Sequence, residues 1–441
     1  MKLTEELLNL IEASPSCFHA TENFCAMLRK EGYIQLRETQ CWQLHAGGKY
    51  FVVRNGSSVV AFRVPRTDFA GFMISAAHSD SPTFKIKENP ELPGKAGVRL
   101  NTEKYGGMLM GTWLDRPLSV AGRVMVRDRA RIATKLVNID RDLLIIPNVA
   151  IHMNRSANDN AKFQANIDTM PLFGGENAAG SFRTLVAQAA GVNADDILGS
   201  DLFLYVRTRG SVLGAQEELI AAPKLDDLEC AFGCMKGFLG AQDGASVPVC
   251  CIFDNEEVGS ETKQGAASTL LSDVLQRICA ALGRTDEGYR MAIANSFMVS
   301  ADNAHAMHPN HPEYADAANC PQMNGGVVVK FNANQRYTTD AVSAAVFRSV
   351  CESAGVPVQV YANRSDLPGG STLGSIANTK VSLNTVDIGL AQLAMHSAYE
   401  TAGARDLSYL VSAMAEFYSR TFRSDGMGAF TMEKNLAATA V

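Results

Sequence analysis

The stretch 250–260, CCIFDNEEVGS, joins an apolar segment to a group of acidic residues. Residues 247–253 are mostly apolar, which predicts a buried strand. Asp254, Glu256 and Glu257 follow it directly. Carboxylates this close repel one another, and burying one without a partner is costly in free energy. The sequence therefore predicts either that cations meet these side chains or that all of them lie in water.

Helical and strand-like patterns alternate around this stretch. After residue 215, strands are predicted at 247–254, 296–302, 327–332, 356–364 and 380–389. Helices are predicted at 226–241, 266–283, 338–355 and 406–422. Before residue 88, two helices precede a hairpin around Asn55 and Gly56, and an apolar strand follows at 71–80. This alternation is typical of an α/β/α sandwich with a largely parallel central sheet.

The middle of the chain has a different texture. Strand-like segments at 118–128, 135–154 and 201–208 are separated by turns, and helical spacing is clear only around 181–191. We therefore expect an α/β fold made of two domains. Residues 1–88 and 216–441 would form a discontinuous α/β/α sandwich domain, and residues 89–215 an inserted β-rich domain.

Composition and charge narrow the classes of function. The chain has 441 residues and a net charge of −6 without any basic run, so we do not expect it to bind nucleic acid. No apolar stretch approaches the ~18 residues that span a bilayer, and the first residues lack a signal-peptide core. None of the ten cysteines has CxxC spacing. We expect reduced cysteines and a soluble, cytoplasmic protein without a membrane partner.

Histidines and acids recur where predicted strands end. Five segments place them at or just past such an end: His78 and Asp80, Asp226, Glu256 and Glu257, Asp302, and His396. In an α/β sheet, binding sites form outside the carboxyl ends of the strands. Segments that lie far apart in the sequence can therefore converge on one spot.

The inventory of candidate ligands fits two divalent metal ions. Two ions about 3.5–4 Å apart that share a bridging carboxylate use about five protein ligands. We assign His78 and Asp302 to one ion, Glu257 and His396 to the other, and Asp226 to the position between them.

Two acidic residues remain for other roles. Glu256 is then free, and a free carboxylate beside an activated water is what a general base requires. Asp80 lies two residues after His78, so it can accept the other ring N–H of that histidine and fix its tautomer.

Each residue alone also has an ordinary structural interpretation. A His-x-Asp sequence after a strand is more often a turn, and paired glutamates that open a helix often serve only the helix dipole. Asp226 and Asp227 could cap the following helix. His396 alone could be a surface or core histidine. Only the recurrence of such residues at several strand ends favours a metallohydrolase.

The motifs resemble those of the M18 metallopeptidases, the aspartyl aminopeptidase family. The matching segments run in family order along essentially the whole chain: AAHSDSPTFKIK (76–87), GTWLDRPLSVAGRV (111–124), IIPNVAIHMNR (145–155), APKLDDLECAF (222–232), DNEEVGSET (254–262), VSADNAHAMHPN (299–310), FNANQRYTTDAV (331–342), SDLPGGSTLGSI (365–376) and VDIGLAQLAMHSAYET (386–401).

The resemblance implies a zinc-dependent aminopeptidase with two ions per subunit, for which Co²⁺ or Mn²⁺ can substitute. It implies the following site residues: ligands at His78, Asp226, Glu257, Asp302 and His396, and the general base at Glu256. It also implies that the inserted domain serves dimerisation within a tetrahedral dodecamer. The preferred substrates would be peptides with an N-terminal Asp or Glu.

Three further residues enter through the resemblance. His152 matches a histidine that reaches into the active site of the neighbouring subunit, and His305 matches one that contacts substrate. Lys330 lies where a cation could hold an acidic side chain. The segment 143–155, LLIIPNVAIHMNR, is predicted to be an apolar strand that ends around His152.

The predicted mechanism is hydrolysis by a water that the two ions activate. Glu256 takes the proton of this water and passes it to the leaving amine. Gly370, Ser371 and Thr372 are small or polar and are candidates for lining the substrate cleft. Two alternatives remain open: a metalloaminopeptidase of neutral or broad specificity, and a non-catalytic oligomeric scaffold of the same fold. The complete ligand set and Glu256 argue against the scaffold.

Overall fold

The computed structural model describes residues 2–159 and 161–434. Its largest sheet has nine strands in the order β1-β2-β3-β13-β4-β14-β18-β16-β17. Their bounds are β1 Ile34–Leu36, β2 Gly48–Arg54, β3 Ser58–Val64, β4 Phe72–His78, β13 Val247–Phe253, β14 Phe297–Ala301, β16 Val327–Phe331, β17 Val358–Ala362 and β18 Asn384–Gly389. The four central strands β13, β4, β14 and β18 are parallel. Their carboxyl ends therefore share one edge of the sheet.

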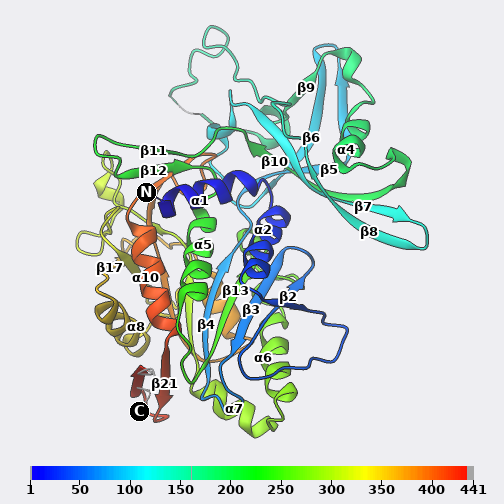
Figure 1. Ribbon diagram of the computed structural model, residues 1–441. Coiled ribbons are helices and arrows are strands. Elements are labelled where there is room, and N and C mark those ends of the chain that lie inside the picture. Colours follow the sequence, from blue (N-terminus) through cyan, green and yellow to red (C-terminus); the bar gives the residue numbers. More distant parts are fainter. Residues whose placement is uncertain (1, 160, 435–441) are drawn as a thin grey trace.

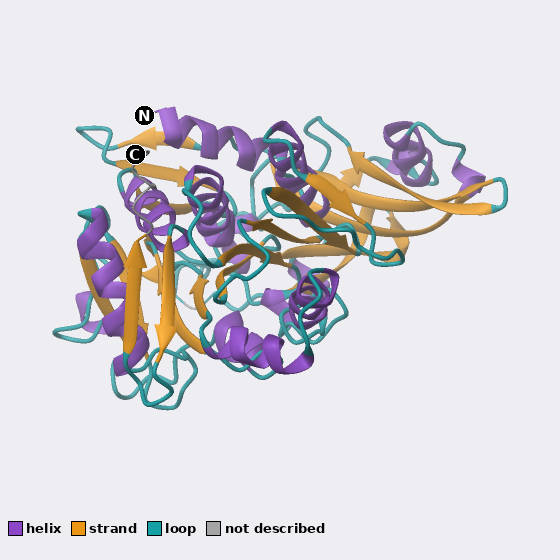
Figure 2. Ribbon diagram, turned by 60° about the horizontal axis from the view of Figure 1, so that its bottom comes forward, coloured by secondary structure: helices purple, strands orange, loops and turns teal. Residues whose placement is uncertain are grey.

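Helices cover both faces of this sheet (Figure 2). One face packs against α1 Lys2–Ala13, α2 Cys17–Lys30, α5 Leu225–Gly240, α8 Ala341–Ala354 and α10 Asp406–Tyr418, and the other against α6 Leu270–Ala281, α7 Asp286–Ala294 and α9 Leu373–Asn378. Strand β13 is buried on both sides: Cys250 and Ile252 face the first group, and Val249, Cys251 and Phe253 face the second. The predicted α/β fold, with a three-layer sandwich, is confirmed.

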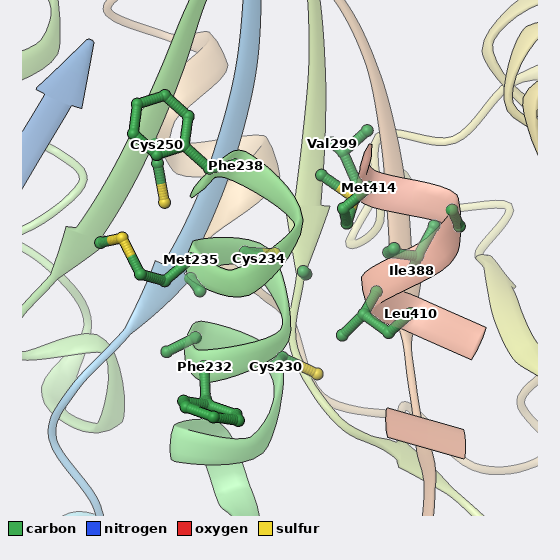
Figure 3. Packing of buried hydrophobic residues seen from close by; sticks show 14 of the residues in the cluster. Cys230, Phe232, Cys234, Met235, Phe238, Cys250, Val299, Ile388, Leu410 and Met414 are labelled. Carbon is green, nitrogen blue, oxygen red and sulfur yellow. The ribbon is translucent and has the colours of Figure 1, made fainter. Parts of the chain in front are cut away.

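Close packing holds α5 against α10 (Figure 3). At Gly233 an added Cβ would lie 2.5 Å from Cδ2 of Leu410, and at Gly237 it would lie 2.5 Å from Cβ of Met414. Only glycine allows the two helices to approach this closely. The position of the amino end of α5, which carries Asp226, is therefore fixed by this helix pair.

The middle of the chain forms a six-stranded sheet with its own core, which we call the inserted module (Figure 1, upper right). Its strand order is β8-β7-β10-β5-β6-β9. The bounds are β5 Thr83–Gly94, β6 Gly97–Tyr105, β7 Leu118–Asp128, β8 Arg131–Asn138, β9 Leu172–Gly174 and β10 Ile197–Val206, with helices α3 Ala165–Asp168 and α4 Phe182–Ala190. The sequence did not reveal β5 and β6, and β5 crosses the predicted boundary between residues 88 and 89.

A five-stranded sheet, β11-β12-β20-β19-β15, lies beside the sandwich. Its strands are β11 Ser211–Leu213, β12 Leu219–Ala222, β15 Ala304–His305, β19 Ala391–Leu393 and β20 Glu400–Gly403. It contributes two connections to the site described below: the β12–α5 junction and the turn between β19 and β20. None of the described helices combines the length and hydropathy that a bilayer-spanning helix requires.

Two predicted elements are wrong. The strand expected over 135–154 ends at Asn138, and beyond it only Leu144 and Ile145 make isolated bridges among the described residues. The apolar side chains of Val149 and Met153 do not enter a core; they are 59% and 83% exposed. The helix expected to reach residue 422 ends at Tyr418, because 420–424 forms strand β21 (Arg420–Ser424), which pairs with β22 (Phe430–Lys434).

Candidate metal centre

Neighbouring parallel strands carry three of the predicted site segments to one edge of the large sheet. His78 is the last residue of β4, and it pairs in register with Phe253, the last residue of β13. β13 leads into the short 3-10 helix η4 (Glu256–Val258), which contains Glu257. Asp302 directly follows β14. The alignment of the strands therefore sets these side chains beside one another.

A buried glutamate joins the two remaining predicted ligands. Asp226 lies at the start of α5, where its backbone angles are not helical. His396 lies in the turn between β19 and β20, with a φ of 66°. Their main-chain N–H groups donate to opposite carboxylate oxygens of buried Glu400, at 3.0 Å and 2.7 Å. Glu400 thus fixes Asp226 and His396 relative to each other.

Asp226 lies between two groups of ligand-type side chains. Its Oδ1 is 3.4 Å from Nε2 of His78, and its Oδ2 is 3.4 Å from Nε2 of His396. The Nε2 atom of His78 is also 3.9 Å from Oδ1 of Asp302. The Nε2 atom of His396 is 3.4 Å from Oε2 of Glu257. The arrangement consists of two clusters that share one carboxylate.

The pKa values of these carboxylates show a shortage of positive charge. Burial, followed by the charge of Asp226, raises the pKa of Glu257 well above its ordinary value. Burial likewise raises the pKa of Asp302. Burial also acts upward on Asp226, but the neighbouring imidazoles of His396 and His78 outweigh that effect and lower its pKa. Positive charge at the centre would stabilise the ionised forms of Glu257 and Asp302 and so lower their pKa values.

The unpaired oxygens of the cluster fit metal ions. At the metal centre, three buried carboxylate oxygens have no hydrogen-bond partner among the described residues: Oδ1 of Asp226, Oδ1 of Asp227 and Oε1 of Glu257. Burial of such atoms without a partner is costly. In each cluster the ligand atoms lie within 4.8 Å of one another. Imidazole and carboxylate donors of this kind suit Zn²⁺.

Asp80 organises the segment that carries the two glutamates. Its Oδ1 accepts the main-chain N–H of Glu256 at 3.1 Å, and its Oδ2 accepts that of Glu257 at 3.2 Å. The Nδ1 atom of His78 lies 3.1 Å from the main-chain oxygen of Asp80 and 3.4 Å from its Oδ1. The ring of His78 thus hydrogen-bonds to the main chain of Asp80. The carboxylate of Asp80 mainly holds the loop that carries Glu256 and Glu257.

A cavity of about 170 Å³ opens onto the clusters. Its lining includes Glu256 and also Gly370, Ser371 and Thr372, the predicted cleft residues. His305 and Lys330 lie on the same lining. The cavity therefore gathers the proposed base and the candidate substrate-binding residues around one space.

Lys330 is buried and already bonded. Its Nζ donates to the main-chain oxygens of Asp302 and Asn303, at 2.8 Å and 3.2 Å, and lies 3.5 Å from Oδ2 of Asp302. Burial acts to lower its pKa, but the charge of Asp302 outweighs that effect and the pKa is raised. Lys330 is thus a fixed cation in the wall of the cavity.

His152 lies apart from both clusters within the described chain. It is exposed in the turn 151–153 of the inserted module, next to exposed Ile151 and Met153. His152 therefore does not complete the site within this chain.

Two acidic residues of the centre were not assigned from the sequence. Asp227, considered only as a helix cap, accepts the main-chain N–H of His78 at 3.0 Å. Glu400 accepts hydrogen bonds from main-chain N–H groups, so the spacing of histidines and acidic residues along the sequence does not reveal it. Its place four residues after His396 in a matched motif was the one available signal.

Comparisons with known sequences agree with this geometry. The chain matches the family described as Aminopeptidase I zinc metalloprotease (M18) over residues 10–418. A probable M18 family aminopeptidase 2 from Clostridium acetobutylicum is 43% identical over 428 residues, covering 95% of this chain and 99% of that protein. One from Pseudomonas aeruginosa is 38% identical over 426 residues, covering 95% and 98%.

Solved structures agree as well. The cryo-EM structure of an Ape4 and Nbr1 complex matches with a TM-score of 0.92 and 35% identity, over 94% of this chain and 85% of that chain. The S. cerevisiae mApe1 dodecamer matches with a TM-score of 0.82 and 27% identity, over 94% and 96%. An M18 family aminopeptidase from Thermotoga maritima, at 21% identity and a TM-score of 0.83 over 95% and 96%, supports the fold alone. The chain belongs to the M18 family, and the protein is a metalloaminopeptidase.

Proposed function

We propose that the enzyme is a zinc-dependent aminopeptidase that uses two ions per subunit and prefers peptides with an N-terminal Asp or Glu. The observation that carries the proposal is the position of Asp226, whose two oxygens face different clusters at equal distances of 3.4 Å. A carboxylate so placed is suited to bridge two ions. His78 and Asp302 would complete one site, and Glu257 and His396 the other.

The chemistry then divides between the ions and Glu256. When bound, the two ions would polarise the scissile carbonyl and lower the pKa of the attacking water. Glu256 takes the proton of that water on its carboxylate and delivers it to the nitrogen of the leaving amine. Burial is the main cause that raises the pKa of Glu256 to about 8. Bound cations act in the opposite direction, which brings the group toward a range where it can both accept and donate a proton.

The preference for acidic residues rests on Lys330, the cation in the cavity wall. Lys330 and His305 line the cavity beside Glu256, and Lys330 has two of its three N–H groups committed to main-chain oxygens. The positive charge of Lys330 would favour a carboxylate on the first substrate residue. The same commitment of Lys330 is the observation that favours the second candidate, an aminopeptidase of neutral or broad specificity.

We also propose self-association through the inserted module. Apolar side chains are exposed on β8 (Ile132, 66%) and in the loop that carries His152 (Val149, 59%; Met153, 83%). These exposed apolar side chains are available for contacts between subunits. Dimers built in this way, assembled further into a tetrahedral dodecamer, would parallel the dodecamer of mApe1.

All ten cysteines are free, which supports a cytoplasmic location.

A panel of aminoacyl substrates, with and without chelator, tests the proposal. We expect activity to disappear on chelation and to return with Zn²⁺, Co²⁺ or Mn²⁺, and we expect kcat/KM for Asp and Glu to exceed that for Leu and Ala. Activity that persists in demonstrably metal-free protein would reject the metal mechanism. A higher kcat/KM for Leu would reject only the acidic preference.

A further inference from the structure

A short segment of the inserted module runs along the metal centre. We call residues 105–112 the strap; it leads from the end of β6 into the 3-10 helix η1 (Met110–Trp113). Both ends are anchored in the module. The ring of Tyr105 packs edge-on against Phe203 with centroids 5.5 Å apart, and the ring of Trp113 packs edge-on against Phe84 at 5.3 Å. The strap is therefore anchored to the inserted sheet.

At one end, the strap touches the residue that organises the glutamate loop. The hydroxyl of Tyr105 donates to Oδ2 of Asp80 at 2.7 Å and accepts Nδ2 of Asn255 at 2.8 Å. The same carboxylate of Asp80 accepts the main-chain N–H groups of Glu256 and Glu257. Tyr105 thus fixes the orientation of a carboxylate that in turn fixes the base and a ligand.

The middle of the strap packs directly on the ligand loop. Gly106 has a φ of +77°, and an added Cβ would lie 3.1 Å from Cβ of Glu257. A side chain at this position would combine backbone strain with a tight contact. The backbone of the strap therefore forms part of the wall behind Glu257.

At its other end, the strap holds the segment of the second histidine. The main-chain N–H of Leu109 donates to the main-chain oxygen of His396 at 3.0 Å. The hydroxyl of Thr112 accepts the main-chain N–H of Ala398 at 2.9 Å. The strap thus bonds to both sides of the second cluster, the Glu257 side and the His396 side.

We propose that the strap positions the second cluster and the general base, with the hydroxyl of Tyr105 as a positioning residue that acts through Asp80. The proposal rests on the proposed roles of Glu256 and Glu257. Its physical reason is that catalytic groups must be held within about 0.5 Å of their productive geometry. Without the hydroxyl, the Asp80 carboxylate loses one of its three hydrogen-bond donors. The loop that carries Glu256 and Glu257 is then held less rigidly, although the proposed chemistry requires fixed positions for both glutamates.

The test compares Tyr105→Phe with Tyr205→Phe in the full-length enzyme. Tyr205 is the matched control because it is also a tyrosine of the inserted module, with its hydroxyl bonded to Oδ1 of Asn138 at 2.8 Å. Both variants keep the ring and lose one hydrogen-bonded hydroxyl. We expect Tyr105→Phe to lower kcat by about 10–100-fold with KM changed by less than about twofold. Tyr205→Phe should leave kcat unchanged.

A spectroscopic readout accompanies the kinetics. In Co²⁺-loaded enzyme, the visible absorption reports the geometry of the ligands, so Tyr105→Phe should alter the spectrum and Tyr205→Phe should not. Thr112→Val, which removes the acceptor of the Ala398 N–H, should alter the same spectrum from the His396 side. Equal losses of Tm in the two tyrosine variants, with wild-type kcat and spectrum for Tyr105→Phe, would overturn the positioning role.

Glu256→Gln separates this proposal from the one on which it rests. Wild-type kcat in Glu256→Gln would reject Glu256 as the base, whatever the result for Tyr105→Phe. Loss of kcat in Glu256→Gln together with an unaffected Tyr105→Phe would reject only the strap.

Discussion

Glu400 accepts the main-chain N–H of His396 at 2.7 Å, and it accepts that of Asp226 through its other oxygen. A carboxylate can serve two N–H donors, whereas a carboxamide offers one oxygen and turns an NH₂ group toward the second donor. Glu400→Gln should therefore leave one buried N–H unsatisfied, at about 1–3 kcal/mol. We also expect weaker metal retention, since Asp226 and His396 lose their common support.

Glu91→Gln is the matched control for this variant. Glu91 also accepts two main-chain N–H groups, those of Gly180 and Phe182, but it lies in the inserted module. Metal content after dialysis against a weak chelator should fall for Glu400→Gln and stay at the wild-type value for Glu91→Gln. Equal metal content in the two variants would contradict the role of Glu400.

The adjacent glutamates should respond differently to the same substitution. Glu256→Gln should keep both ions and lose about 10²–10⁴-fold in kcat, because it removes a proton acceptor. Glu257→Gln should lose the ion bound with His396, because it removes a ligand. Metal analysis of both purified variants decides between the roles. If the ion content falls in Glu256→Gln and not in Glu257→Gln, the two roles are exchanged.

A buried glutamate outside the two clusters should make stability depend on pH. Burial, and then the charge of Asp406, raise the pKa of Glu229 from 4.5 to about 8. Its Oε2 accepts Nδ2 of Asn303, but its Oε1 has no partner among the described residues. Between pH 4.5 and 8 the folded state holds this proton and the unfolded state does not. The contribution of Glu229 to stability is therefore present below pH 4.5 and is lost as the pH rises toward 8.

Glu229→Gln should remove this dependence, since the amide stays neutral. Measured on metal-free protein, Tm of the variant relative to wild type should rise between pH 5 and pH 8. Glu352→Gln, at an exposed position on α8, serves as the control and should follow wild type throughout. A constant difference between Glu229→Gln and wild type across this range would show that Glu229 does not titrate there.

The exposed histidine of the inserted module should act on a second subunit. His152→Ala should lower kcat without changing metal content or assembly, because His152 belongs to neither cluster of its own chain. His152 would donate a hydrogen bond to the developing oxyanion of the partner's substrate, and loss of such a donor costs about 2.7–4 kcal/mol of transition-state stabilisation. Mixing inactive His152→Ala with inactive Glu256→Gln should then restore some activity, since a mixed dimer holds one site with both residues intact. Subunit exchange without recovered activity would contradict sharing between subunits.

The sequence predicted correctly those features that depend on short segments of the chain. The apolar run before Glu256 and Glu257 predicted a buried strand, and β13 is buried on both faces. The apolar run 71–80 predicted another strand, and β4 pairs with β13 in register up to His78. Periodicity and strand-end polarity are properties of short windows, so they could be recognised without the structure.

The supporting contacts could not be recognised in this way. Tyr105 reaches Asp80, and Glu400 reaches Asp226, from segments that only the tertiary fold brings near. Hydrogen bonds to main-chain N–H groups leave no constraint on the identity of the donor residue. The false strand at 143–155 had a different cause: its apolar side chains, such as Val149 and Met153, point to the surface of this chain. An apolar pattern does not distinguish a buried strand from an exposed loop.

The proposed ligand set begins at His78 and ends at His396, on strands and turns that only the complete sheet brings together. During synthesis, amino-terminal parts of a chain leave the ribosome first. The nascent protein therefore carries its entire inserted module and both glutamates before His396 has been translated. Because the proposed second site includes His396, a copy truncated before this residue would lack that site and should not cleave peptides.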